Sequence, residues 1–112
     1  MKTYYFALDL KEDVKLIEEY KEHHRNVWPE IEESIKKSGI LNLEIYCVHN
    51  RLFMIMKTEE SFSFEVKDKL DNKNEKVQEW ETLMWKYQQA LPIAKKGEKW
   101  ILMEKIYTLQ KK

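Results

Sequence analysis

Three residues with side chains suited to chemistry or aromatic contact, Tyr20, His24 and Trp28, are spaced four residues apart. At that spacing, side chains in an α-helix lie on one face, one turn after another. The neighbours that share this face are apolar, so an imidazole and a phenol hydroxyl would lie inside an apolar stripe. A neutral imidazole can give and take a proton near pH 7, which suits general acid–base catalysis. We therefore take His24 as the candidate catalytic residue and Tyr20 as a hydrogen-bonding partner of a ligand or of the imidazole.

His24 also has a structural interpretation, a core histidine hydrogen-bonded to a neighbour, and periodicity alone does not decide between the two. A metal site built from His23 and His24 is disfavoured, because adjacent helical side chains diverge by about 100°. Neither residue has a second histidine one turn further along the chain. We expect no metal and no other cofactor.

The bulk composition fits one folded domain that spans residues 1–112. Charged residues make up 36% of the chain, but basic and acidic residues balance at 20 each, which argues against nucleic acid as the main partner. The single cysteine, Cys47, excludes an internal disulfide and fits a reducing compartment, and we expect it to be a small buried hydrophobic residue. No signal peptide and no membrane-spanning apolar run is visible, so we expect a soluble cytoplasmic protein that does not enter a membrane.

Segments whose apolar residues recur at every second position, as in a strand, follow segments whose apolar residues recur with a helical period. Several single residues mark the ends of the helices. Asp13 is a candidate N-cap, Pro29 fits the first position of a helix after a bend at Trp28, Gly39 closes that helix, and Ser61 could cap the next one. In chain order we expect a strand over 3–10, helices over 13–26 and 29–38, strands over 40–48 and 51–58, a helix after residue 61 that breaks near 71–74, a helix over 75–90 and a last strand over 99–109.

The order β-α-β-β-α-β is typical of the ferredoxin-like class of α+β folds. It predicts a four-stranded antiparallel sheet with its helices on one face. The other face would then be bare, and a chain of this size can cover it by pairing two sheets in a homodimer.

Aromatic side chains are the second candidate feature of the site. Trp80 and Met84 share one side of their helix, and Trp85 lies about 100° around from Met84. Tryptophan faces pack against the C–H faces of sugars, and they fill cores and interfaces equally well. Glu44 and Tyr46 point to one face of the strand over 40–48, and they would line a pocket if that face is the inner one. These residues indicate a small α+β domain with an aromatic-lined polar site, but they do not name a substrate.

Several segments taken together resemble the L-rhamnose mutarotase family. They are Tyr20-x3-His24-x3-Trp28-Pro29-Glu30, the stretch 42–46 and Trp85-Lys86-Tyr87. The segments 50–56, 77–81 and 97–100 are similar to the branch of that family described as L-fucose mutarotases. The resemblance extends from Tyr4 to Leu109.

The resemblance implies a dimeric α+β barrel and a cofactor-free enzyme that interconverts the α and β anomers of a 6-deoxy-L-sugar. It implies that His24 is the proton donor and that Tyr20 binds the sugar. A strand tyrosine and two adjacent tryptophans also bind sugar in rhamnose enzymes, and they match Leu43, Met84 and Trp85 here. Because a tyrosine and a tryptophan are replaced, we expect L-fucose to be favoured over L-rhamnose, with Glu44 or Tyr46 supplying the lost hydrogen bond.

Two other functions fit the same residues. Small dimeric α+β barrels also host cofactor-free or haem-linked monooxygenases with a helix histidine in an aromatic pocket, because fold alone does not fix function. A non-catalytic sugar-binding module would bind the sugar and leave its rate of anomer exchange unchanged.

Overall fold

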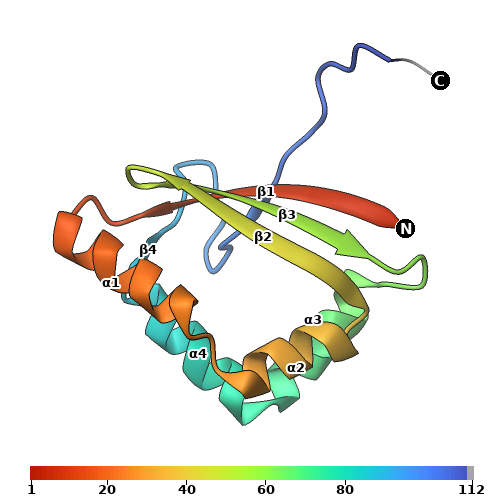
Figure 1. Cartoon of the computed structure of the whole chain (residues 1–112), viewed down its shortest axis with the longest axis horizontal. Coiled ribbons are helices and arrows are strands. Elements are labelled where there is room, and N and C mark those ends of the chain that lie inside the picture. The colour runs from red at the N-terminus through yellow and green to blue at the C-terminus, as the bar shows by residue number, and fades with distance from the viewer. Residues whose placement is uncertain (111–112) are drawn as a thin grey trace.

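The computed structural model describes residues 1–110, and its elements follow the predicted order with additional breaks. Figure 1 shows the strands forming one layer, with all the helices on one side of it. This is the predicted α+β arrangement. The elements are β1 (Lys2–Leu10), α1 (Val14–Arg25), α2 (Pro29–Lys37), β2 (Ile40–Val48), β3 (Arg51–Thr58), α3 (Phe64–Lys73), α4 (Glu75–Trp85), β4 (Gln88–Gln89) and β5 (Ile101–Leu102).

The strands form one antiparallel sheet in the order β2-β3-β1-β4, and β5 also pairs with β1. This strand order is that of the predicted ferredoxin-like class. The predicted sheet had four strands, whereas here two short strands, β4 and β5, pair in turn with β1 in place of one last strand. In the two central strands, β1 and β3, every second residue is buried against the helices. The residues between them face away from the helices. The buried residues of these strands are Phe6, Leu8, Leu10, Leu52, Met54, Met56 and Thr58.

The N-terminal end of α1 and the bend after it form as the sequence predicts. The Asp13 carboxylate accepts hydrogen bonds from the backbone N–H groups of Lys15, at 2.9 Å, and Leu16, at 3.1 Å. Trp28 is extended, with φ −58° and ψ 134°, and Pro29 begins α2. After α2, Gly39 has a φ of +96°, which a glycine adopts without strain, and β2 starts at the next residue.

The second half of the chain departs from the predicted bounds in three places. The α3 helix is capped by Ser63, not Ser61. The helix expected over 75–90 ends at Trp85, because the chain turns and pairs with β1, where the backbone N–H of Lys11 donates to the carbonyl of Tyr87 at 2.8 Å. The predicted strand over 99–109 is wrong beyond β5.

Residues 103–110 leave the body of the protein on the side of the sheet opposite the helices (Figure 1). Their apolar side chains at Ile106, Tyr107 and Leu109 are exposed. Alternating apolar residues form a strand only when a partner strand is in reach. Among the described residues, the strand pairing between β1 and the predicted strand 99–109 is limited to β5. Cys47 is also exposed, contrary to the prediction, because it lies near the end of the edge strand β2.

Two groups of buried side chains fill the space between the sheet and the helices. The larger one joins the sheet to α1, α2 and α4 through Leu8, Ile17, Ile31 and Trp80, among others. The smaller one surrounds Phe62 at the far end of the sheet. Within residues 1–110, none of the helices is long and apolar enough to cross a membrane.

The core placement of Leu8 gives a stability prediction. Leu8 is 0% exposed, whereas Leu70 on α3 is 47% exposed. Leu8→Ala should lower the free energy of unfolding by about 2–5 kcal/mol, because it leaves a cavity in close-packed surroundings. Leu70→Ala, the same chemical change at the surface, should cost less than about 1 kcal/mol. Urea denaturation of both variants measures the difference, and equal losses would contradict this description of the core.

Candidate active site

A cavity of about 640 Å³ lies between the inner face of the sheet and the helices. Its walls come from all the layers of the fold: the inner strand residues Phe6, Leu43, Ile45, Met54 and Met56, the α1 residues Tyr20 and His24, the α4 residues Val77, Trp80 and Met84, and Gln88, Lys99 and Trp100. A second hollow of about 530 Å³ lies on the outside of α3 and α4, is lined by polar and charged side chains, and contains none of the candidate residues. The central cavity is therefore the candidate site.

Tyr20 and His24 lie together in this cavity. Their ring centroids are 4.4 Å apart, and His24 Nδ1 lies 2.9 Å from the backbone carbonyl oxygen of Tyr20. A carbonyl can only accept, so Nδ1 carries the hydrogen of this bond. In the neutral ring the other nitrogen, Nε2, then has a free lone pair and can accept a proton.

Burial shifts the protonation of both side chains. It lowers the pKa of His24 below its usual 6.5, and the hydrogen bond to the Tyr20 carbonyl opposes this only in part. Burial raises the pKa of Tyr20 to about 12, against a lowering contribution from the hydrogen bond with Gln88. At neutral pH the cavity thus holds a neutral imidazole beside a protonated phenol, which together offer a proton acceptor and a hydrogen-bond donor.

Aromatic and thioether side chains form the wall next to His24. Trp80 and Met84 are both buried and line the cavity, as predicted from their shared helix side. The Trp80 ring lies 5.6 Å from the His24 ring and 5.1 Å from the Trp28 ring, both in edge-on contacts. Leu43 and Ile45 line the cavity from the strand side. Such walls suit a ligand with an extended C–H face.

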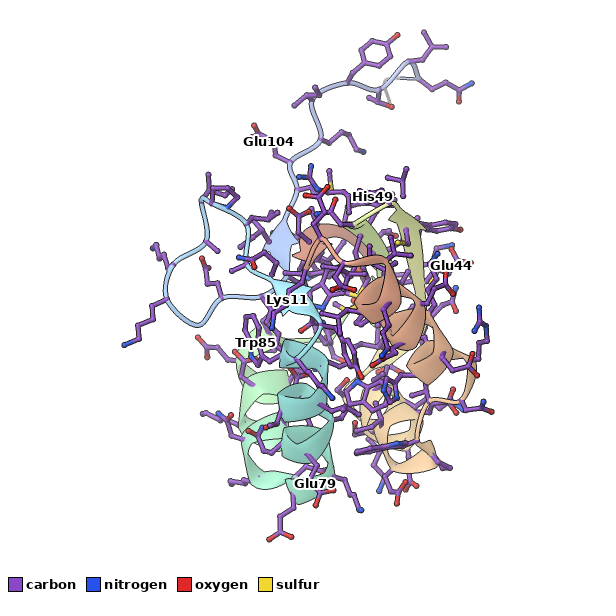
Figure 2. The ribbon with its side chains drawn as sticks, turned by 90° about the vertical axis from the view of Figure 1, so that its left-hand side faces the viewer. Lys11, Glu44, His49, Glu79, Trp85 and Glu104 are labelled. Carbon is purple, nitrogen blue, oxygen red and sulfur yellow. The ribbon has the colours of Figure 1, made fainter. Side chains whose placement is uncertain are left out.

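Three predicted site residues lie outside the cavity lining. Glu44 and Tyr46 are on the outer face of the sheet, where the Tyr46 hydroxyl donates to the Glu44 carboxylate at 3.1 Å and Tyr46 is 52% exposed. Trp85 is 36% exposed, and the Lys99 ammonium lies 4.8 Å from its ring centroid. Figure 2 shows Glu44 and Trp85 on opposite sides of the molecule.

The lining also contains polar and charged side chains that were not predicted, and two of them lie near the candidate residues. Lys99 lines the cavity and forms an ion pair with Glu81 of α4, which ties the segment before β5 to that helix. Gln88 is buried and approaches the Tyr20 hydroxyl. Its inward direction comes from the pairing of β4 with Leu10, a long-range contact that no local pattern in the sequence signals.

His23 has a different hydrogen-bond partner from His24. Its Nε2 lies 3.1 Å from the Tyr87 hydroxyl, and that hydroxyl donates to the Glu19 carboxylate at 3.1 Å. Across the described residues, no group of three or more His, Cys, Asp or Glu side chains is arranged to hold a metal ion. Within the cavity, the neutral imidazole of His24 and the hydroxyl of Tyr20 are suited to acid–base chemistry on a small organic ligand.

Comparison with known proteins agrees with this arrangement. The family model for L-rhamnose mutarotase matches residues 3–109. An L-fucose mutarotase from Xanthomonas campestris pv. campestris is 40% identical over 106 residues, which cover 93% of this chain and 85% of that protein. A UPF0734 protein from Dictyostelium discoideum is 38% identical over 112 residues, covering 96% of this chain and 90% of that protein.

The fold has a solved relative as well. The crystal structure of an L-rhamnose mutarotase from Formosa agariphila superposes with a TM-score of 0.71 at 23% identity, over 98% of this chain and 100% of that one. The family model covers nearly the whole chain, and the relatives are matched over most of their length. The chain therefore belongs to the L-rhamnose mutarotase family and is a sugar mutarotase, an isomerase that acts on carbohydrates.

Proposed function

We propose that this mutarotase interconverts the α and β anomers of a 6-deoxy-L-sugar, that it prefers L-fucose to L-rhamnose, and that His24 carries the proton. The observation that carries the proposal is the Tyr20–His24 pair, with its fixed tautomer, inside the central cavity. The preference for L-fucose is supported by the 40% identity with an L-fucose mutarotase over most of both chains.

Mutarotation opens the sugar ring, lets the resulting carbonyl turn about the C1–C2 bond, and closes the ring again on the other face of that carbonyl. Opening moves one proton from the anomeric hydroxyl to the ring oxygen, and closing reverses this transfer. The anomeric hydroxyl loses its proton, the bond from the anomeric carbon to the ring oxygen breaks, and a carbonyl forms. The electron pair of the broken bond stays on the ring oxygen, which gains a proton. Because both oxygens are bonded to one carbon, a single imidazole nitrogen can take the proton from one and return it to the other. His24 Nε2 does this, and Tyr20 holds a sugar hydroxyl.

The state of His24 suits a reaction that runs in both directions. Its lowered pKa leaves Nε2 free to accept at neutral pH. After transfer, the imidazolium is in an environment that disfavours its charge, so it gives the proton back readily. Trp80 and Met84 pack against the C–H face of the sugar. Trp85, predicted for the same wall, approaches the cavity only through Lys99.

Removal of the imidazole should abolish catalysis. His24→Ala should fold and lose roughly 10²–10⁴-fold in catalysed anomer exchange, the contribution of a positioned acid–base group. Saturation-transfer NMR on L-fucose measures the exchange rate directly. The control is His49→Ala, since His49 lies at the β2–β3 turn (Figure 2) and its imidazole bonds only to Glu12 among the described residues. Exchange by His24→Ala at the wild-type rate would remove His24 from the mechanism.

The pKa of His24 predicts the acid side of the rate profile. Burial lowers this pKa below 6.5, so the neutral form is the working form at pH 7 and above. As the pH falls, kcat/KM should hold until the pH passes 6.5 and then drop with a midpoint below that value. The NMR titration of the His24 ring should show the same midpoint. A midpoint above 6.5 in either measurement would contradict the assigned state.

The same proposal includes a homodimer that covers the outer face of the sheet. This face carries Tyr5, Phe53 and Ile55 on the two central strands, and Tyr46 and Val48 on β2. The rings of Tyr5 and Phe53 stack with centroids 6.1 Å apart. The helices leave this face bare, and the apolar C-terminal segment projects on the same side (Figure 1). Two such faces would pack as a sandwich about a two-fold axis.

The proposed location is the reducing cytoplasm, which the exposed Cys47 fits.

A charge in the middle of this face should separate the subunits. Ile55→Lys should convert a dimer into a monomer in size-exclusion chromatography with light scattering, because it would place an unpaired charge in a buried contact. The matched change Ile93→Lys, in the exposed loop after β4, should leave the dimer intact. A monomeric wild type, or a dimeric Ile55→Lys variant, would contradict the proposed interface.

A further inference from the structure

Gln88 has a buried polar atom without a partner. The residue is 5% exposed and lines the cavity, and its Oε1 has no hydrogen-bond partner among residues 1–110. Leaving such an atom unpaired costs free energy, because it has lost its water without gaining a partner, so an unsatisfied polar group in a native structure calls for an explanation. Leucine or methionine would fill the same position without this cost.

The other end of the same carboxamide touches the candidate machinery. Gln88 Nε2 lies 3.5 Å from the Tyr20 hydroxyl and donates to it. The Tyr20 hydroxyl thus accepts from Gln88 and keeps its own hydrogen available for a ligand. Because a pKa of about 12 holds this hydroxyl protonated, the donor persists throughout the physiological pH range.

The backbone fixes where this carboxamide points. Gln88 pairs with Leu10 in the β1–β4 ladder, and Leu10 is buried on the inner face of the sheet. Residues directly opposite one another in an antiparallel ladder point to the same face. The next residue, Gln89, pairs with Asp9 and is exposed. Two adjacent glutamines therefore have opposite directions, one into the cavity and one toward solvent.

We propose that Gln88 is a specificity-determining residue that accepts a hydrogen bond from a sugar hydroxyl other than the anomeric one. This inference rests on the proposed function and extends it. It assigns to Gln88 the hydrogen bond to the sugar that the sequence had led us to expect from Glu44 or Tyr46. Tyr20 donates and Gln88 accepts on one side of the cavity, and a hydroxyl group needs one partner of each kind. In the proposed function, His24 acts on the two oxygens of the anomeric carbon. The Gln88 carboxamide is bonded to Tyr20, so its free oxygen is left to meet a hydroxyl further along the sugar ring.

The stability of the free protein separates this role from a structural one. Gln88→Leu removes the unpartnered acceptor, so the melting temperature of the sugar-free variant should not fall. L-Fucose should bind this variant about tenfold more weakly, because one sugar hydroxyl loses its partner. The loss should appear in KM more than in kcat, since a ring hydroxyl does not change its charge during the reaction. A structural glutamine would show the reverse: a lower melting temperature and an unchanged KM.

Mono-deoxy analogues of L-fucose test the contact itself. Analogues that lack the hydroxyl at C2, C3 or C4 are assayed by NMR anomer exchange with wild type, Gln88→Leu and the solvent-facing control Gln89→Leu. One analogue should lose about tenfold in kcat/KM relative to L-fucose with wild type and with Gln89→Leu. With Gln88→Leu the same analogue should lose clearly less, because only the hydrogen bond from Tyr20 is left to lose. Equal losses in all three proteins would overturn the inference while leaving the mutarotase intact. Absence of exchange of L-fucose by wild type would overturn the proposed function, and this inference with it.

Discussion

The hydrogen bond between His24 Nδ1 and the Tyr20 carbonyl is the contact on which the chemistry of this site depends. It fixes the tautomer, and the tautomer decides that Nε2 is the nitrogen that can accept a proton. The bond spans one helical turn, so it requires only that α1 be intact at this point. Burial of the same turn against Trp80 lowers the histidine pKa and raises that of Tyr20. One local contact and one packing contact therefore set both protonation states.

The position of α1 relative to α4 is in turn held by Tyr87. Its hydroxyl donates to Glu19 and lies 3.1 Å from His23 Nε2, so it joins two turns of α1 to a residue just beyond the end of α4. This contact gives the adjacent histidines different roles: His23 binds the neighbouring element, and His24, about 100° around the helix, faces the cavity. The connection also brings Gln88, the next residue in the chain, beside Tyr20. The structural contact and the proposed sugar contact are thus consecutive residues.

The sequence predicted well the features that depend on a few neighbouring residues. Asp13 as a cap, Pro29 at the start of α2 and the alternation of β1 and β3 all have local causes, and the structure confirms them. The failures involve long-range pairing. Alternation shows that Leu43 and Glu44 face opposite sides of β2, but the side that faces the helices is fixed only by the assembled sheet. The inward direction of Gln88 follows from its ladder with Leu10, and the predicted strand over 99–109 ends early where the pairing with β1 ends.

The apolar character of the buried lining bears on which sugars the site accepts. Met54, Met56 and Met84 offer no strong hydrogen-bonding atom. Among the charged residues of the lining, Glu81 is paired with Lys99 and Lys67 with Asp71. A methyl group in such a region is favourable, at about 0.8 kcal/mol per buried carbon. A hydroxymethyl group there would lose its water without gaining a partner, at a cost of about 1–3 kcal/mol. Discrimination between a 6-deoxy sugar and an ordinary hexose can therefore arise from a missing partner as much as from an added contact. In the proposed function, the polar side chains read the ring hydroxyls, while the apolar wall excludes the wrong substituent at C6.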